Sequence, residues 1–105
     1  MATQPEETPL LKLLAQMTAA SLDATSLDDE QLMLVRIAAL VSIDAPTASY
    51  VLNLGAASDS GVTVEQIQGV LAGVAPIIGT ARVVSAAGRL TQALGVAIEL
   101  SDLGD

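Results

Sequence analysis

Apolar residues recur along this chain at the spacing of an α-helix, in five segments separated by polar or glycine-containing turns. The first segment opens at Thr8 and Pro9, where threonine can cap a helix and proline fits its first position. Its apolar residues are Leu10, Leu13, Leu14 and Met17. This spacing predicts a helix that runs to about Ala20 and has an apolar face.

The second segment is apolar around nearly its whole circumference, from Leu32 to Ile43. Ser26, followed by Asp29 three residues later, fits a capping box at the start of this helix. A helix without a polar face is expected at the centre of a bundle rather than on its surface. The only charge inside this apolar stretch is Arg36.

Three further helices follow. The third is predicted from Thr47 to about Ala57 and stops at a polar turn, Ser58–Gly61. The fourth starts at a second capping box, formed by Thr63 and Gln66, and we expect Pro76 and Gly79 to end it. The fifth runs from about Thr80 to Glu99. No segment alternates as a strand does, so the pattern predicts an all-α, compact bundle of about five helices.

One helical domain is expected over residues 8–100, between a disordered acidic leader (1–7) and an acidic tail (101–105). Glycines recur inside the predicted third, fourth and fifth helices, where each costs about 1 kcal/mol relative to alanine. Close approach of helices, within the subunit or between subunits, would account for them. We therefore expect a homo-oligomer.

Composition removes several kinds of chemistry. The chain has no cysteine and no histidine, and Tyr50 is its single aromatic residue. Thiol redox chemistry, thiolate zinc sites and histidine acid–base catalysis are therefore excluded, and the acidic residues show no metal-ligand spacing. A net charge of −8 argues against binding to nucleic acid or to an anionic membrane surface. The polar, acidic start does not resemble a signal peptide, so we expect a cytoplasmic, acidic protein without a membrane span.

Three stretches carry a resemblance to a known family: LDDEQLMLVRIAALV, SDSGVTVEQIQGVL and APIIGTARVVSAAGRL. Their order over Leu27–Leu94 resembles the carboxymuconolactone decarboxylase-like family, which includes the alkylhydroperoxidase D peroxidases. The resemblance implies the same all-α fold and a homo-oligomer, often a trimer or a hexamer.

The same resemblance locates the family's reactive residues. Its Cys-x-x-Cys pair falls here on Pro46 and Ser49, and its histidine falls on Asn53. The acid that assists the thiol pair would fall near Met33 or Leu34. All of these positions are unreactive, so thiol peroxidase chemistry is excluded and no cofactor is expected.

Four residues form the candidate substrate-binding site: Arg36, Ser49, Tyr50 and Asn53. A guanidinium in an apolar helix needs an anion, which could be Asp29, Glu65, a neighbouring subunit or a ligand carboxylate. The three residues of the third helix form either a hydrogen-bonded core cluster or, with Arg36, a pocket for an apolar carboxylate or a lactone. Tyr50 is the one candidate general acid. The polar stripe of Arg82, Ser85, Arg89 and Gln92 is expected to be solvated, to contact another subunit or to bind anions.

Three functions remain open. The leading hypothesis is a pseudoenzyme that acts as a homo-oligomeric scaffold or small-molecule-binding module. The first alternative is a cofactor-free, non-redox decarboxylase or isomerase that acts on a lactone or cyclic carboxylic acid. The second is an accessory subunit that docks on an enzyme complex through its acidic ends.

Overall fold

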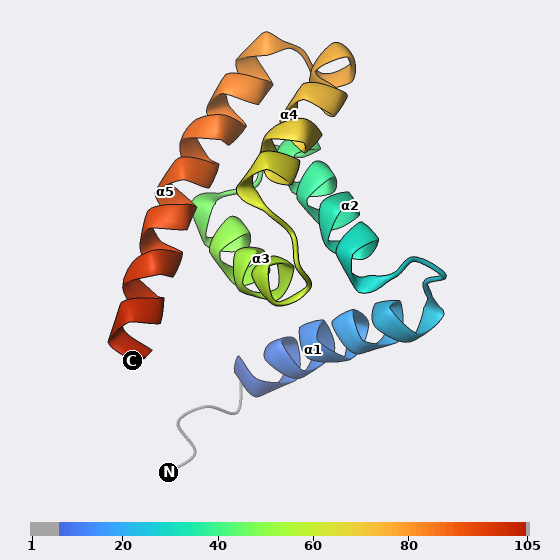
Figure 1. Cartoon of the computed structure of the whole chain (residues 1–105). Helices are drawn as coiled ribbons and strands as arrows, with labels where there is room; N and C mark the ends of the chain where they lie inside the picture. Colours follow the sequence, from blue (N-terminus) through green and yellow to red (C-terminus); the bar gives the residue numbers. More distant parts are fainter. Residues whose placement is uncertain (1–6, 105) are drawn as a thin grey trace.

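The computed structural model describes the backbone of residues 7–104 and the side chains of residues 8–95. Figure 1 shows its five helices: α1 (Glu7–Ala24), α2 (Asp29–Ser42), α3 (Thr47–Asp59), α4 (Val64–Ile78) and α5 (Thr80–Gly104). The described chain contains no strand, which confirms the all-α prediction. Residues 1–6 of the expected leader and Asp105 lie outside the described residues. Helix α5 continues over residues 101–104, past the end expected near Glu99.

Two capping boxes begin the central helices. At α4 the predicted pair is confirmed, because Gln66 N donates to Thr63 Oγ1 over 3.1 Å and Thr63 N donates to Gln66 Oε1 over 2.8 Å. At α2 the predicted cap, Ser26, is two residues too early. Asp28 caps this helix instead, and it exchanges hydrogen bonds of 2.8 and 3.1 Å with Gln31. The negative charge of a carboxylate at this position is also stabilised by the positive end of the helix dipole, whereas a serine hydroxyl carries no charge.

Pro76 does not end α4 as expected, because the helix continues to Ile78. Proline at this position removes one backbone bond, to the carbonyl of Ala72, and both residues are exposed, where water can compensate. The predicted stop at Gly79 is confirmed. Gly79 has φ +89° and ψ 163°, a conformation almost confined to glycine.

The core lies between α2, α3, α4 and α5, and α2 packs against each of the other three. The expectation of a central α2 is confirmed. Four of its residues are buried: Leu32, Met33, Ile37 and Val41. Tyr50 and Leu54 of α3, Ile67 of α4 and Leu90 of α5 meet them, and four buried alanines allow the helices to approach closely.

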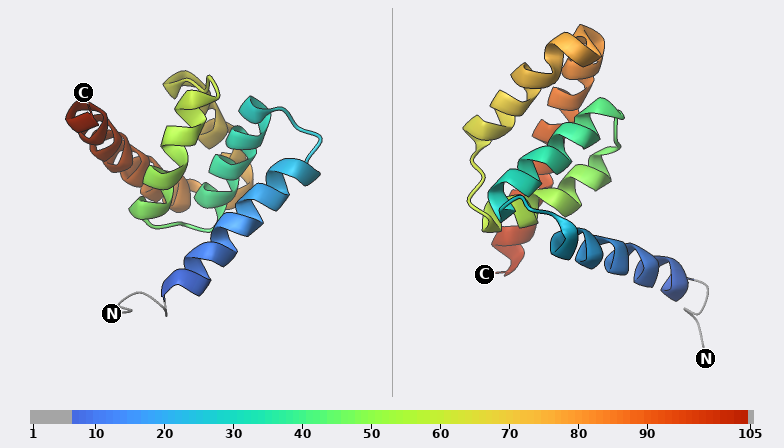
Figure 2. Two further views of the ribbon diagram at one scale, coloured as in Figure 1. Left: turned by 90° about the horizontal axis from the view of Figure 1, so that it is seen from below. Right: turned by 90° about the vertical axis from the view of Figure 1, so that its right-hand side faces the viewer.

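Helix α1 stands apart from this core. It makes no close backbone contact with the other four helices, and no side chain over residues 8–24 is buried. Figure 2 shows its N-terminal half projecting away from the bundle. Its large apolar side chains are 46% to 61% exposed: Leu10, Leu11, Leu13, Leu14, Met17 and Leu22. Over the described residues, no helix combines the length and apolar character that a bilayer span requires.

The helical glycines do not serve packing within the subunit. A Cβ atom added to any one of them would meet no heavy atom within 4 Å: Gly55, Gly69, Gly73, Gly88 and Gly95. All five are exposed. Close approach of helices inside the subunit therefore does not explain these glycines. Contact between subunits, the other explanation offered by the sequence, stays a prediction.

The contrast between Gly73 and Gly79 gives a stability prediction. Gly73→Ala should raise the free energy of unfolding of the monomer by about 0.5–1 kcal/mol, because it adds helix propensity without a clash. Gly79→Ala should lower it by about 1–3 kcal/mol, because alanine strains that backbone conformation. Urea denaturation at a protein concentration where the chain is monomeric measures both. A destabilised Gly73→Ala monomer would contradict the open space seen at this glycine.

Candidate functional site

The positions expected from the resemblance to replace the thiol pair and the histidine lie at the N-cap and in the first two turns of α3. Pro46 is the N-cap residue and provides no side-chain cap. Ser49 and Asn53 are both half-buried, one turn apart. Asn53 Nδ2 donates to the carbonyl oxygen of Ser49 over 2.8 Å. This amide is therefore engaged with the backbone of its own helix, and no hydrogen bond joins the side chains of Ser49, Tyr50 and Asn53 to one another.

Tyr50 is fully enclosed, with 1% of its surface exposed. Its hydroxyl has no hydrogen-bond partner among the described protein atoms. Burial raises the pKa of the phenol above its usual 10.0; the nearby Arg89 guanidinium lowers the pKa and the Asp44 carboxylate raises it further. A phenol with a raised pKa holds its proton more firmly, so Tyr50 is poorly suited to donate a proton at neutral pH.

The charges beside Tyr50 belong to a corner between α2 and α3. Asp44 occupies this corner with a positive φ of 56°, which aspartate tolerates better than most residues. Arg89 Nη1 donates to the carbonyl oxygens of Asp44 and Ala45, over 2.8 and 2.9 Å, and to Asp44 Oδ1 over 3.1 Å. Ser85 Oγ donates to the same carboxylate oxygen over 3.0 Å.

The polar stripe of α5 extends these contacts on both sides of the corner. Arg82 Nη1 donates to the carbonyl oxygen of Ser42 over 2.8 Å, and Gln92 Oε1 accepts from Thr47 Oγ1 over 3.1 Å. The stripe was expected to be solvated, to contact another subunit or to bind anions. Arg82 and Gln92 are exposed, as a solvated stripe would be, and the stripe also fastens the α2–α3 corner within the subunit, where its arginines donate to backbone carbonyls. Asp44 was not recognised from the sequence, although an acidic residue just before Ala-Pro between two helices is a turn signal.

Arg36 lies at the opposite end of α3 from Tyr50. Its Nη2 atom donates to Ser21 Oγ of α1 over 3.0 Å, and it forms no ion pair with any described carboxylate. The expected pairs with Asp29 and Glu65 are therefore absent from this part of the chain. Tyr50 and Asp59 are nine residues apart, or about 13 Å along the helix at ~1.5 Å per residue.

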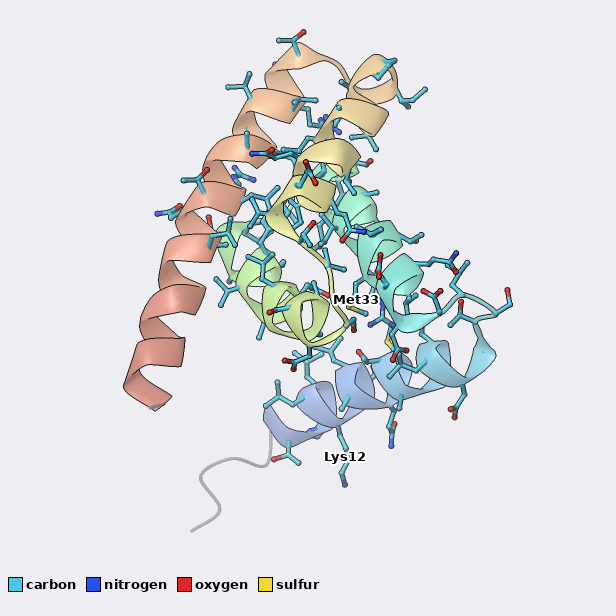
Figure 3. All side chains as sticks on the ribbon, viewed as in Figure 1. Lys12 and Met33 are labelled. Carbon is cyan, nitrogen blue, oxygen red and sulfur yellow. The ribbon has the colours of Figure 1, made fainter. Side chains whose placement is uncertain are left out.

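A pocket of about 310 Å³ opens beside Arg36, between α1, α2 and the end of α3. Its walls are formed by Thr18, Leu22, Asp29, Met33, Arg36, Ala56, Asp59 and Ser60. In Figure 3, Met33 lies where α1, α2 and α3 approach one another, and Lys12 points away from the bundle. Of the four candidate site residues, only Arg36 lines this pocket. The structure thus separates Arg36 from the Ser49, Tyr50 and Asn53 group.

Metal-ligating side chains do not gather anywhere in the part of the chain that the structure describes: no group of three or more acidic residues is close enough to hold an ion. The polar groups of the pocket are one guanidinium, two carboxylates and the hydroxyls of Thr18 and Ser60. They can bind charged and hydrogen-bonding groups.

Comparison with known proteins identifies the family. Residues 8–93 match the model of the carboxymuconolactone decarboxylase family, and the chain therefore belongs to that family. The resemblance seen in the sequence is confirmed, and the match includes α1 as well as the core helices. No curated protein and no solved structure gave a match.

The Arg89 corner predicts a stability difference between two arginines of α5. Arg89→Ala removes three hydrogen bonds and should lower the free energy of unfolding by about 1–2 kcal/mol, a range reduced because the pair is partly exposed. Arg82→Ala removes one hydrogen bond and is the matched control, with an expected loss of at most about 1 kcal/mol. Urea unfolding of both variants is the measurement. Equal losses of unfolding free energy would contradict a special role of Arg89 at the α2–α3 corner.

Tyr50 predicts a loss of stability at alkaline pH. Its pKa is higher in the folded protein than in the unfolded chain, so above pH 10 the unfolded state releases the proton first and the free energy of unfolding falls. Tyrosinate absorbance reports this residue alone, because it is the only tyrosine. Ionisation should occur above pH 10.0 and should accompany unfolding. In Tyr50→Phe this part of the alkaline decline should be missing. A folded protein that titrates at the ordinary pKa would disprove the effect of burial.

Proposed function

We propose that this member of the carboxymuconolactone decarboxylase family is a homo-oligomeric scaffold or small-molecule-binding module that works without thiol chemistry. The observation that carries the proposal is the apolar face of α1, which stays about half exposed and makes no close backbone contact with the other four helices. The proposed assembly is of identical chains, and its number of subunits follows from the mass measured below.

The absence of thiol chemistry follows from the whole sequence. Neither cysteine nor histidine occurs anywhere in the 105 residues, so no thiolate can form and no imidazole can activate one. The enclosure and raised pKa of Tyr50 lend no support to a decarboxylase or isomerase that would use it as a proton donor. A scaffold or binding role needs none of these groups.

Self-association is supported by what α1 would gain from it. An isolated helix of 18 residues is marginal in water, and α1 obtains almost no packing from its own subunit. Fully burying one leucine contributes about 1.5–3 kcal/mol, and six large apolar side chains of this helix are about half exposed. Monomeric proteins rarely leave so continuous an apolar surface in contact with water.

The exposed glycines point in the same direction. Gly69 and Gly73 are four residues apart on α4, and Gly88 and Gly95 are seven apart on α5, so each pair shares a helix face. Each of these glycines exposes bare backbone, and the space above it within the described part of the subunit is open. Such faces allow a helix of another subunit to approach closely, and this would offset the cost of helical glycine.

Charge introduced on α1 tests the assembly. Leu14→Glu places a carboxylate on the apolar face and should raise the dissociation constant at least about 100-fold, because it removes apolar burial and adds a charge to be desolvated. Gln16→Glu adds the same charge on the polar side of α1 and is the matched control. Light scattering coupled to gel filtration should show an oligomer for the wild type and Gln16→Glu, and a monomer for Leu14→Glu. A wild-type chain that stays monomeric at its highest soluble concentration would refute the assembly.

A further inference from the structure

We propose that the pocket beneath α1 binds a small zwitterion with an apolar side chain, such as a free aliphatic amino acid. This proposal rests on the proposed function of a small-molecule-binding module. It adds the position of the binding site and the chemical class of the ligand. The ligand's carboxylate would lie on Arg36, its ammonium group on Asp59 and Asp29, and its side chain against the apolar wall.

Arg36 provides the place for a carboxylate. A guanidinium has five N–H donors, and the structure shows one hydrogen bond from it, to Ser21 Oγ. No described carboxylate pairs with it, although it is half-buried on α2. A partly desolvated guanidinium with free donors favours a planar anion that can accept two bonds.

Asp59 provides the place for an ammonium group. It is the last residue of α3, where the negative end of the helix dipole disfavours a carboxylate. Its side chain forms no hydrogen bond or ion pair within the described chain that would offset this cost. Helix stability therefore does not explain this residue. Asp29 lines the same pocket from the first turn of α2, where the dipole does explain it.

The balance of charge selects the zwitterion over simpler ligands. Arg36 contributes one positive charge to the pocket, and Asp29 and Asp59 contribute two negative charges. A ligand with only a carboxylate would be repelled by both aspartates, and one with only an amine would leave the Arg36 guanidinium without an anion. The apolar carboxylate expected from the sequence took no account of Asp59 and treated Asp29 only as an alternative partner of Arg36.

The size and the remaining walls favour a compact aliphatic ligand. About 310 Å³ lies at the lower end of the ~300–1,000 Å³ range of small-molecule sites. Leu22, Met33 and Ala56 supply apolar surface from three different helices. Because Thr18 and Leu22 belong to α1, a bound ligand would join this helix to the bundle, which it otherwise meets through the Arg36–Ser21 hydrogen bond.

Titration calorimetry with three compounds of similar apolar shape tests the proposal. L-leucine carries both charges, N-acetyl-L-leucine only the carboxylate, and isopentylamine only the ammonium group. L-leucine should bind saturably, and each of the other two at least about tenfold more weakly, because each loses one charged contact. Arg36→Gln and Asp59→Asn should each weaken L-leucine binding to a similar extent.

Two substitutions outside the pocket are the controls. Arg82→Gln matches Arg36→Gln, since Arg82 also makes one hydrogen bond to another helix or its end, and Asp23→Asn matches Asp59→Asn on an exposed part of α1. Both should bind L-leucine as the wild type does. Circular dichroism shows whether each variant is folded, and Arg36→Lys, which keeps the charge, replaces Arg36→Gln should the latter unfold.

Each outcome bears on the proposal. No saturable binding of L-leucine, equal binding of all three compounds, or tighter binding of N-acetyl-L-leucine would overturn it. Light scattering on the same samples separates this result from the proposed assembly. An intact oligomer that binds no L-leucine removes only the zwitterion site, whereas a monomer that binds L-leucine removes only the assembly.

Discussion

The arrangement of the bundle depends on the contact between Arg89 and the α2–α3 corner. This guanidinium donates to two consecutive carbonyl oxygens and to the Asp44 carboxylate. Backbone carbonyls at a sharp turn have no helical partner, and Asp44 holds a positive φ there. By satisfying these groups, α5 fixes where α2 ends and where α3 begins. The position of α3 in turn determines which residues surround each of its two ends.

The N-terminal end of α3 carries the positions that the sequence resemblance assigns to the family's thiol pair and histidine, and here these positions make contacts within the fold. Asn53 bonds to its own helix, and Tyr50 fills the core beside the corner. The other core residues are aliphatic side chains and alanines, and the ring of Tyr50 is the largest fully buried side chain among them. The unpartnered hydroxyl is the cost of placing that ring there.

The C-terminal end of α3 is more open, and its neighbours are polar. Arg36, Asp29 and Asp59 line the same pocket there and form no ion pair within the described residues, beneath a helix that the bundle holds only loosely. These charges lie next to an apolar wall formed by Leu22, Met33 and Ala56, and this arrangement is the basis of the proposed ligand site. The apolar face of α1 extends from this pocket into solvent, so ligand binding and assembly would involve the same helix.

Sequence alone determined the local features of this protein. The five helices, the Thr63–Gln66 cap and the Gly79 stop follow from residues close together in the chain, and the absence of thiol and imidazole chemistry follows from composition. Tertiary structure decided which distant residues meet. The α5 arginines bind carbonyls that a side-chain pattern does not display, and Arg36 faces α1 rather than Tyr50 because the first two turns and the last turn of α3 lie apart on a rigid helix. Periodicity specifies the face on which a residue lies, whereas the packing of helices determines what that face meets.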